Sequence, residues 1–438
     1  MLSVILFVVV FLAVILISNK TKMNLGVLCI LAAFILGGWY AKAPLNNIIN
    51  YFPLSVLTTL LATTIFFAYI NQTEAFKGVV DRVLYATKGK TWFYPFAIFF
   101  SVFLIACIGG NSSAPIIVSP IAFAIAASTG MHPLLAVMSG YLASAGIGMA
   151  PWTPGGVVFS GLMEPGAGDK KMTALIMAII ILFVGALLYL IATYFVLGGN
   201  KLQDKGTFVA KEPVPFTREQ KTALITLLVV MLVALIPAII KSFSTGTLNK
   251  VCTWMGNYMD IKVLCFIGAL FLALMKIGDG QKVMREMVPW GIFLDIGGAC
   301  VLINCAKDMG IIDLISKWAS DSLPGWLMPF VCVLVAGLLS FVSNAMVILP
   351  MFSPIAATMA VAGGQSPVVL CTCLLVGCVA TGLSPVSMGG SLHSLGATKE
   401  QREAIFGKQF LAAFIHLGIY LVFALVGGFG LVGKIFGV

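Results

Sequence analysis

The sequence predicts an all-α polytopic membrane protein with about ten transmembrane helices and two re-entrant hairpins in two inverted-topology repeats. Three observations support this prediction. Of the 438 residues, 60% are hydrophobic and 10% are charged, whereas soluble domains carry about 25% charged residues. Two apolar stretches are interrupted by short polar tips, and residues in the two halves of the chain match at a fixed spacing.

Apolar runs of about 20 residues, the length that crosses a bilayer, define the expected spans. They fall near 2–18, 24–41, 52–72, 132–161, 172–197, 221–242, 259–276, 288–306, 367–395 and 406–434. The first run lacks the basic start and small-residue cleavage site of a signal peptide, so we interpret it as a transmembrane helix. The net charge of +10 is typical of basic cytoplasmic loops here and does not indicate nucleic-acid binding.

Each polar tip predicts a hairpin that enters the membrane and turns back. The first hairpin, 92–128, turns at Gly109-Gly110-Asn111-Ser112-Ser113, and the second, 325–361, turns at Ser343-Asn344-Ala345. Non-helical backbone at membrane depth is tolerated only where protein buries it or a watery cavity hydrates it. Two such tips therefore predict a binding cavity near the bilayer midplane.

The two halves match at a spacing of 234 residues. Trp92 corresponds to Trp326, and Ser119-Pro120-Ile121-Ala122 corresponds to Ser353-Pro354-Ile355-Ala356. We therefore expect a first repeat at 1–197, a cytoplasmic linker at 198–220 and a second repeat at 221–438. Each half has an odd number of full spans, so the second must be inverted. Both termini are expected outside, because that orientation puts most of the 26 Lys and Arg residues in the cytoplasm.

A second interrupted span follows each hairpin, at 132–161 and 367–395. Pro and Gly should unwind these spans midway, which frees carbonyl oxygens for a small cation and N–H groups for an anion. A simple proline kink and ordinary helix capping are the alternatives. The expected substrate-binding residues are Asn111, Ser112, Ser113, Thr153, Pro154, Ser343, Asn344, Ser384, Pro385 and Ser387. The expected ion-coupling residues are Gly110, Asn111, Gly148, Asn344, Thr381, Gly382 and Asp295.

Asp295 is the clearest acidic residue inside a predicted span. Intramembrane carboxylates are costly and often mark ion or proton pathways, although a hydrogen bond to neighbouring backbone is the alternative. Asp260 is expected at a helix end. His132, His393 and His416 show no metal or catalytic spacing; only His393 lies near a break, where contact with substrate is the alternative to packing. We expect the 10 cysteines to pack in helices and no cofactor or metal, with Na⁺ or H⁺ as the coupling ion.

This layout resembles the ion transporter superfamily of secondary carriers, in particular the divalent-anion/sodium symporters. The run Ala150-Pro151-Trp152-Thr153-Pro154-Gly155-Gly156-Val157-Val158, with Gly161-Leu162-Met163 after it, is similar to the bacterial dicarboxylate (malonate) carrier family. The symporter tips read Ser-Asn-Thr, whereas the tips here read Gly-Asn-Ser and Ser-Asn-Ala. The resemblance implies that Asn111, Ser112, Ser343 and Asn344 line substrate and cation sites, and that the protein is a homodimer.

The expected function is therefore secondary active transport of small organic anions, with C3–C4 dicarboxylates as the leading candidates, driven by a cation gradient through an elevator-type or other alternating-access mechanism. The expected location is the inner (plasma) membrane. The same fold carrying a monocarboxylate or another anion, or acting as a cation/proton antiporter, is the alternative. A membrane-embedded enzyme is disfavoured because HExxH and GxSxG motifs are absent from the sequence. A channel is disfavoured because a pseudo-symmetric site within one chain is typical of a carrier.

Overall fold

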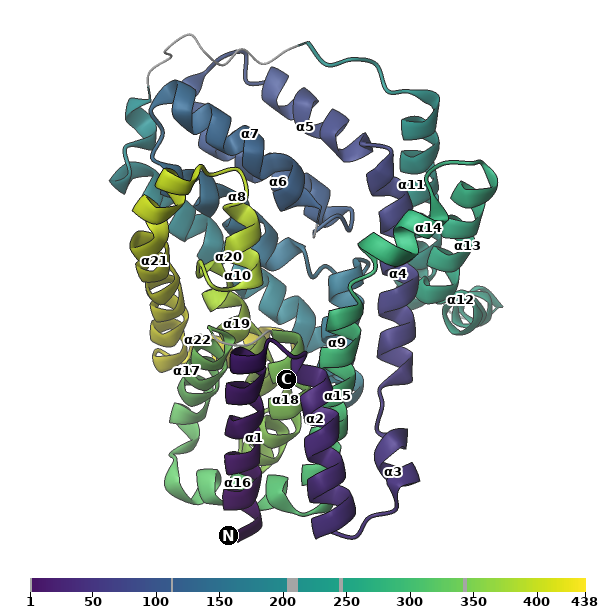
Figure 1. Cartoon of the computed structure of the whole chain (residues 1–438), viewed down its shortest axis with the longest axis vertical. Helices are drawn as coiled ribbons and strands as arrows, with labels where there is room; N and C mark the ends of the chain where they lie inside the picture. Colours follow the sequence, from purple (N-terminus) through teal and green to yellow (C-terminus); the bar gives the residue numbers. More distant parts are fainter. Residues whose placement is uncertain (1, 112, 203–211, 244–246, 342–344) are drawn as a thin grey trace.

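The computed structural model describes residues 2–111, 113–202, 212–243, 247–341 and 345–438, and within these ranges all regular structure is helical (Figure 1). Three predicted site residues, Ser112, Ser343 and Asn344, lie outside the described residues. The fold class is therefore all-α, as the sequence predicts.

The helices fall in the order expected for two similar halves. The first half contains α1 (Leu2–Thr21), α2 (Leu25–Ala33), η1 (Phe34–Tyr40), α3 (Leu45–Asn50), α4 (Leu54–Gln72), α5 (Ala75–Tyr85), η2 (Thr91–Phe93), α6 (Tyr94–Cys107), α7 (Ala114–Thr129), α8 (Pro133–Ile147), α9 (Pro154–Ala167), η3 (Gly168–Lys170), α10 (Lys171–Val196) and η4 (Gly199–Lys201). The second half contains α11 (Arg218–Phe243), α12 (Thr247–Tyr258), α13 (Ile261–Leu274), α14 (Gly280–Lys282), η5 (Val283–Met287), α15 (Trp290–Asp308), α16 (Ile311–Ser322), η6 (Gly325–Leu327), α17 (Met328–Ser340), α18 (Ala345–Ala362), α19 (Pro367–Ala380), η7 (Thr381–Leu383), α20 (Met388–His393), α21 (Lys399–Leu425) and α22 (Gly428–Ile435).

Six helices among the described residues are long and apolar enough to cross a membrane, or seven if a bent pair formed by α12 and α13 is one span. Several shorter apolar helices accompany them, including α6, α7 and α8. The chain is therefore a multi-pass membrane protein, and the count of ten spans stays a prediction.

The helices of both predicted hairpins agree with their expected ranges. α6 and α7 pack against each other on either side of the first tip, and α17 and α18 do so on either side of the second. Gly109 adopts a φ of +94°, in the left-handed region that glycine favours, and a Cβ there would lie 2.1 Å from the ring of Phe67. The first chain reversal therefore depends on this glycine.

Two predicted spans are shorter than expected. The run 406–434 is not one helix, because α21 ends at Leu425 and Gly427, with a φ of +75°, turns the chain into α22. The run 259–276 forms only α13, whose N-cap residue Asp260 pairs with Lys262 at 2.8 Å. Asp260 thus lies at a helix end, as predicted.

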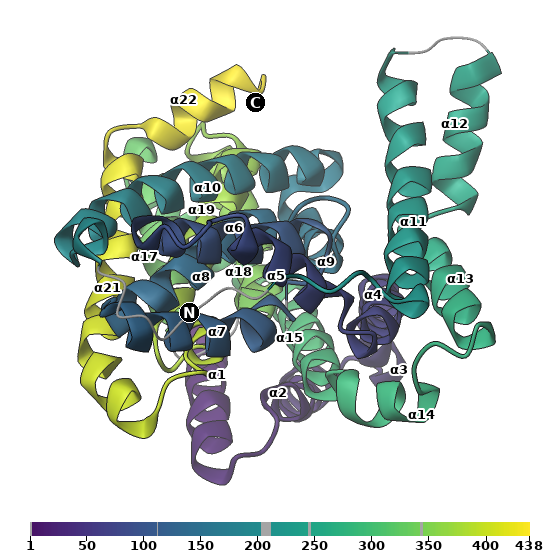
Figure 2. The same ribbon diagram turned by 90° about the horizontal axis from the view of Figure 1, so that it is seen from above.

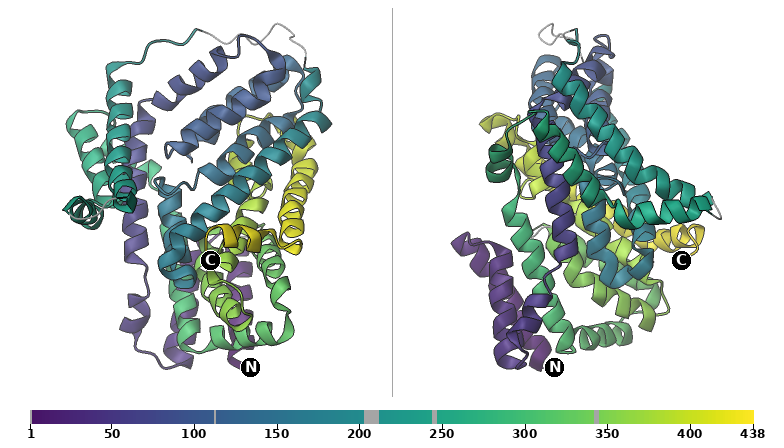
Figure 3. Two further views of the ribbon diagram at one scale, coloured as in Figure 1. Left: turned by 180° about the vertical axis from the view of Figure 1, so that it is seen from behind. Right: turned by 90° about the vertical axis from the view of Figure 1, so that its right-hand side faces the viewer.

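The centre of the molecule is formed by α8 and α19. α8 buries residues 134–146 without interruption, and α19 buries residues 368–378. Around them pack the two hairpins and α10, whereas α11 and α12 project away from the main body (Figures 2 and 3). Because α8 and α19 both lead into an interrupted segment, the packing places both interruptions inside the protein.

Candidate functional site

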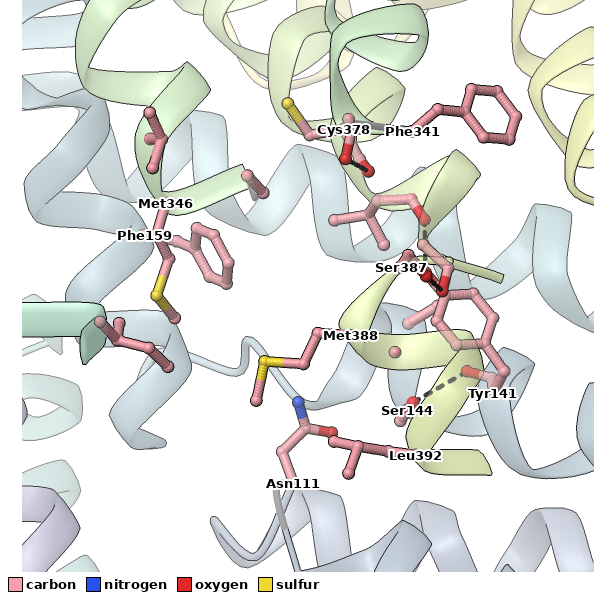
Figure 4. Close-up of a pocket in the computed structure, with 18 of the residues that line it drawn as sticks. Asn111, Tyr141, Ser144, Phe159, Phe341, Met346, Cys378, Ser387, Met388 and Leu392 are labelled. Carbon is pink, nitrogen blue, oxygen red and sulfur yellow. Dashed lines mark hydrogen bonds between the residues drawn. The ribbon is translucent and has the colours of Figure 1, made fainter. Parts of the chain in front are cut away.

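A cavity of about 460 Å³ lies where the first hairpin tip meets both interrupted segments (Figure 4). Its wall also includes Ser18 of α1, Leu25 of α2 and Asp295 of α15. The full lining is Ser18, Leu25, Asn111, Pro115, Tyr141, Ser144, Ala145, Met149, Phe159, Ile292, Asp295, Ser340, Phe341, Ala345, Met346, Val347, Cys378, Val379, Gly382, Val386, Ser387, Met388, Gly389, Leu392 and His393. The described lining thus holds one carboxylate and neither Lys nor Arg.

Asn111 extends from the first tip into this cavity (Figure 4). Its side-chain oxygen Oδ1 is buried and has no hydrogen-bond partner among the described residues. The same side chain lies directly over Gly148, at the end of α8. A buried polar atom without a partner costs about 1–3 kcal/mol, so this oxygen is well placed to accept a ligand.

The first interrupted segment runs from Gly148 to Thr153, between α8 and α9. Thr153 Oγ1 donates to the carbonyl oxygens of Gly148 at 3.0 Å and Ala150 at 2.8 Å. It also accepts the backbone N–H of Gly156 at 3.1 Å, which caps the N-terminus of α9. A single hydroxyl thus fixes the turn between the two helices.

The second interrupted segment repeats this arrangement. Ser387 Oγ donates to the carbonyl oxygens of Gly382 at 2.5 Å and Ser384 at 2.8 Å, and it accepts the N–H of Gly390 at 3.2 Å. Each of these residues lies 234 positions after its counterpart in the first segment. The matched residues therefore form matched turns.

Each hairpin is also bonded to the second helix of the other half. Ser119 of α7 donates to the carbonyl oxygen of His393 at 2.9 Å and accepts the N–H of Gly396 at 3.0 Å. Its counterpart Ser353 of α18 donates to the carbonyl oxygen of Leu162 in α9 at 3.1 Å. The cavity is therefore assembled from both halves of the chain.

Asp295 is held at the wall of the cavity by the start of α2. Its Oδ1 accepts the backbone N–H of Gly26 at 3.0 Å. The positive end of a helix dipole favours a carboxylate. Asp295 thus has the backbone hydrogen bond that the sequence offered as an alternative, and it still lines the cavity.

The predicted site residues divide into three groups. Asn111, Gly382, Ser387 and Asp295 line the cavity. Outside its lining are Gly110, Ser113, Gly148, Thr153, Thr381 and Ser384, which are buried, Pro385, which is half-buried, and Pro154, the first residue of α9. Ser112, Ser343 and Asn344 are not described. Most of the buried group therefore shapes the backbone beneath the wall; Thr381, for example, donates to the carbonyl oxygen of Gly337 at 3.0 Å.

Several lining residues were not predicted, among them Tyr141, Ser144, Phe159, Cys378 and Met388. A signal for one pair was present, because Ser144 and Cys378 are counterparts at the spacing of 234 and both line the cavity. His393, offered as an alternative contact, also lines it, with Nε2 at 3.3 Å from Ser144 Oγ.

The other two histidines lie away from the cavity lining. His416 is buried between α19 and α21. His132 caps α8, and its Nε2 lies 3.2 Å from Lys408 Nζ. Burial, and then the charge of Lys408, lowers the pKa of His132. No group of three or more His, Cys, Asp or Glu residues able to hold a metal ion is found in the described part of the chain.

Comparison with known proteins gives one family match and one match among curated sequences. The family model CitMHS, described as citrate transporter, matches residues 11–377. A 91-residue segment is 32% identical to sodium-dependent high-affinity dicarboxylate transporter 3 of Caenorhabditis elegans, covering 20% of this chain and 16% of that protein. The chain thus matches only about a sixth of this relative's length.

A solved structure has the same overall fold. The YdaH transporter of Alcanivorax borkumensis, described as having an unusual topology, superposes with a TM-score of 0.59. The match covers 90% of this chain and 87% of that one, at 15% sequence identity. At this identity the likeness concerns the fold alone.

Proposed function

The chain belongs to the CitMHS family of citrate transporters, and from this premise we propose that it is a secondary active carrier of small organic anions driven by a cation gradient. It is a transporter and not an enzyme, as its family shows. The leading substrates are C3–C4 dicarboxylates. The observation that carries the proposal is the unpartnered oxygen of Asn111 in a cavity between two interrupted helices.

Neutral groups hold the anion in this proposal. The cavity offers the amide of Asn111, the hydroxyls of Ser144 and Ser387, and backbone at Gly382 and Gly389. Without a Lys or Arg in the described lining, the carboxylates are bound by hydrogen bonds and dipoles. Such binding is weaker than an Arg–carboxylate pair, which suits a site that must release its substrate.

The coupling ion occupies oxygen ligands close to the first tip. Amide and carbonyl oxygens are hard ligands of the kind that small hard cations prefer. Asn111 Oδ1 lies over Gly148, whose carbonyl oxygen belongs to the same turn. The matched curated relative is named a sodium-dependent transporter, which supports Na⁺ as the first ion to test, with H⁺ at Asp295 as the alternative.

Alternating access would follow from two inverted repeats, 1–197 and 221–438, joined by the linker 198–220. The matched turns at Thr153 and Ser387 support this organisation. We further propose residence in the inner membrane, an elevator-type movement of the hairpins and interrupted helices, and assembly as a homodimer.

Citrate is the second candidate substrate, because the matching family is described by that name. A cavity of about 460 Å³ lies within the range of about 300–1,000 Å³ usual for small-molecule sites. Volume alone therefore admits both a dicarboxylate and the larger tricarboxylate.

Uptake into proteoliposomes tests the proposal. Labelled malonate, succinate, malate, citrate and a monocarboxylate would be supplied with an inward Na⁺ gradient, a pH gradient or neither. Gradient-dependent accumulation of a di- or tricarboxylate is the expected result. Accumulation of the monocarboxylate alone, or cation exchange without any organic anion, would favour the alternative carriers of the same fold.

A further inference from the structure

The backbone at the end of α19 is bonded to side chains of three other helices. The last carbonyl groups of a helix have no partner within it. Here the carbonyl oxygen of Cys378 accepts Ser340 Oγ at 2.8 Å, and that of Val379 accepts Tyr141 OH at 2.5 Å. The carbonyl oxygen of Ala380 accepts His416 Nδ1 at 2.8 Å. The donors come from α17, α8 and α21, so three helices fix this end.

One buried amide spans the whole second interruption. Gln409 Nε2 donates to the carbonyl oxygen of Leu383, before the interruption, at 2.9 Å and to that of Gly390, after it, at 3.2 Å. Its Oε1 accepts Ser394 Oγ at 3.2 Å. Gln409 is only 1% exposed, so water does not compete for these bonds.

The donors on α21 lie on one face of that helix. Gln409 and His416 are seven residues apart, which is close to two helical turns. Arg402, seven residues before Gln409, donates to the carbonyl oxygens of Ser394 and Leu395 at 3.2 and 3.3 Å. One stripe of α21 therefore bonds to backbone along the second interrupted element from Ala380 to Leu395.

The first interruption cannot be held in the same way. The counterparts of Ser340, Gln409 and His416 at the spacing of 234 are Ala106, Leu175 and Leu182. None of these side chains can donate a hydrogen bond. From outside its own turn, the first interruption receives the bond from Trp152 Nε1 to the carbonyl oxygen of Cys107, at 2.7 Å.

The two interruptions thus differ in how they meet the cavity. The second presents Ser387 and Gly389 on backbone that neighbouring helices hold. The first has Asn111 next to it, with its buried Oδ1 unpartnered.

We propose that Gln409 and His416 are positioning residues that keep the second interruption in one geometry, while the first interruption is the part that becomes ordered when ligand binds. The ligand part rests on the proposed function; the rigid second interruption does not. Neither residue touches the substrate, because neither lines the cavity.

Amide hydrogen exchange of the purified protein tests the proposal without any substrate. In the wild type, peptides covering 381–390 should exchange about tenfold or more slowly than peptides covering 148–156. In Gln409→Leu, exchange of 381–390 should rise about tenfold or more, since a lost donor leaves two buried carbonyl groups unpaired, while 148–156 is unchanged. Glu403→Gln, an exposed site on the same helix, is the matched control and should behave as wild type. Equal exchange in the two wild-type segments, or an unchanged 381–390 in Gln409→Leu, would overturn the proposal.

A second variant covers the case in which Gln409→Leu does not fold. Gln409→Glu keeps the size of the side chain, but its ionised form has no proton to donate. Relative to wild type at the same pH, 381–390 should exchange faster at high pH and recover protection as the pH falls and the carboxyl is protonated. A residue that only packs would give wild-type exchange at every pH, and that result would contradict the positioning role.

Transport then connects the two ideas. If a polycarboxylate is carried, Gln409→Leu should raise KM about tenfold with a smaller change in Vmax, and added ligand should slow exchange at 148–156 more than at 381–390. Ligand protection confined to 381–390 would overturn the assignment of the first interruption. Failure to carry any organic anion would remove the proposed function and leave the exchange contrast standing.

Discussion

The side chain of Asn111 lies over Gly148 so closely that a Cβ at position 148 would stand 2.3 Å from Asn111 Oδ1. The contact joins the first hairpin tip to the end of α8. It exists only because residue 148 has no side chain.

Gly148→Ala should therefore displace Asn111 without unfolding the protein, since the atoms that must move are the end of one side chain. We expect normal insertion and a loss of uptake of about tenfold or more, measured in proteoliposomes. Gly418→Ala is the control, because a Cβ there meets nothing within 4 Å. Wild-type uptake in Gly148→Ala would show that the position of Asn111 does not matter for transport.

Asn111→Ala should abolish or strongly impair transport while the protein still purifies normally. The substitution removes the unpartnered oxygen, so it costs little folding energy but deprives the ligand of a contact of about 1–3 kcal/mol. Asn344→Ala, at the second tip, is expected to act in the same direction. Near-normal uptake in both variants would reduce these residues to helix caps.

Thr153 and Ser387 make the same bonds, but only Ser387 lines the cavity. Thr153→Val and Ser387→Ala should each lower stability by about 1 kcal/mol, the usual cost of a lost N-cap. Only Ser387→Ala should also raise KM directly. Ser387→Thr keeps the cap and should retain stability. Thermal unfolding with uptake kinetics checks the pair, and an equal rise of KM in both would argue against a substrate contact at Ser387.

Asp295→Asn separates coupling from binding. An asparagine oxygen can still accept the N–H of Gly26, so the start of α2 should stay capped. If Asp295 carries the coupling ion or proton, exchange of substrate should persist while accumulation against a gradient is lost. One charge crossing 100 mV supplies about 2.3 kcal/mol, enough for roughly a fifty-fold ratio. Accumulation at the wild-type level would assign the cation wholly to neutral ligands.

Orientation can be tested at two exposed positions, Arg285 and Lys170. In a protein cleared of native cysteines, Lys170→Cys should react with an impermeant thiol reagent in intact cells, and Arg285→Cys should not. The reverse labelling would place both termini in the cytoplasm.

The sequence predicted the hairpins and interruptions well because local chemistry determines them. Gly109 and Gly110 end α6, and Thr153-Pro154 and Ser387 begin new helices through caps that depend on neighbours within a few residues. The predicted span 406–434 was wrong because an apolar run does not reveal that Gly427 turns left-handed.

The site was predicted only in part because its wall is made by tertiary contacts. Tyr141 reaches the carbonyl oxygen of Val379 across 238 residues, and Gln409 reaches that of Leu383 from another helix. Neither residue belongs to a motif, and each stands in an otherwise apolar helix. Their importance follows from where helix ends leave carbonyl groups free, which a single sequence does not specify.

The bonds of Ser119 also set the timing of assembly. Its partners His393 and Gly396 lie 274 and 277 residues further along the chain. At about 5–20 residues per second, the ribosome adds those residues roughly 14 to 55 seconds after the first hairpin is made. During that interval the hairpin must wait in the membrane with this hydroxyl unpaired. A chain truncated anywhere before residue 393 lacks both bonds, however complete its first half.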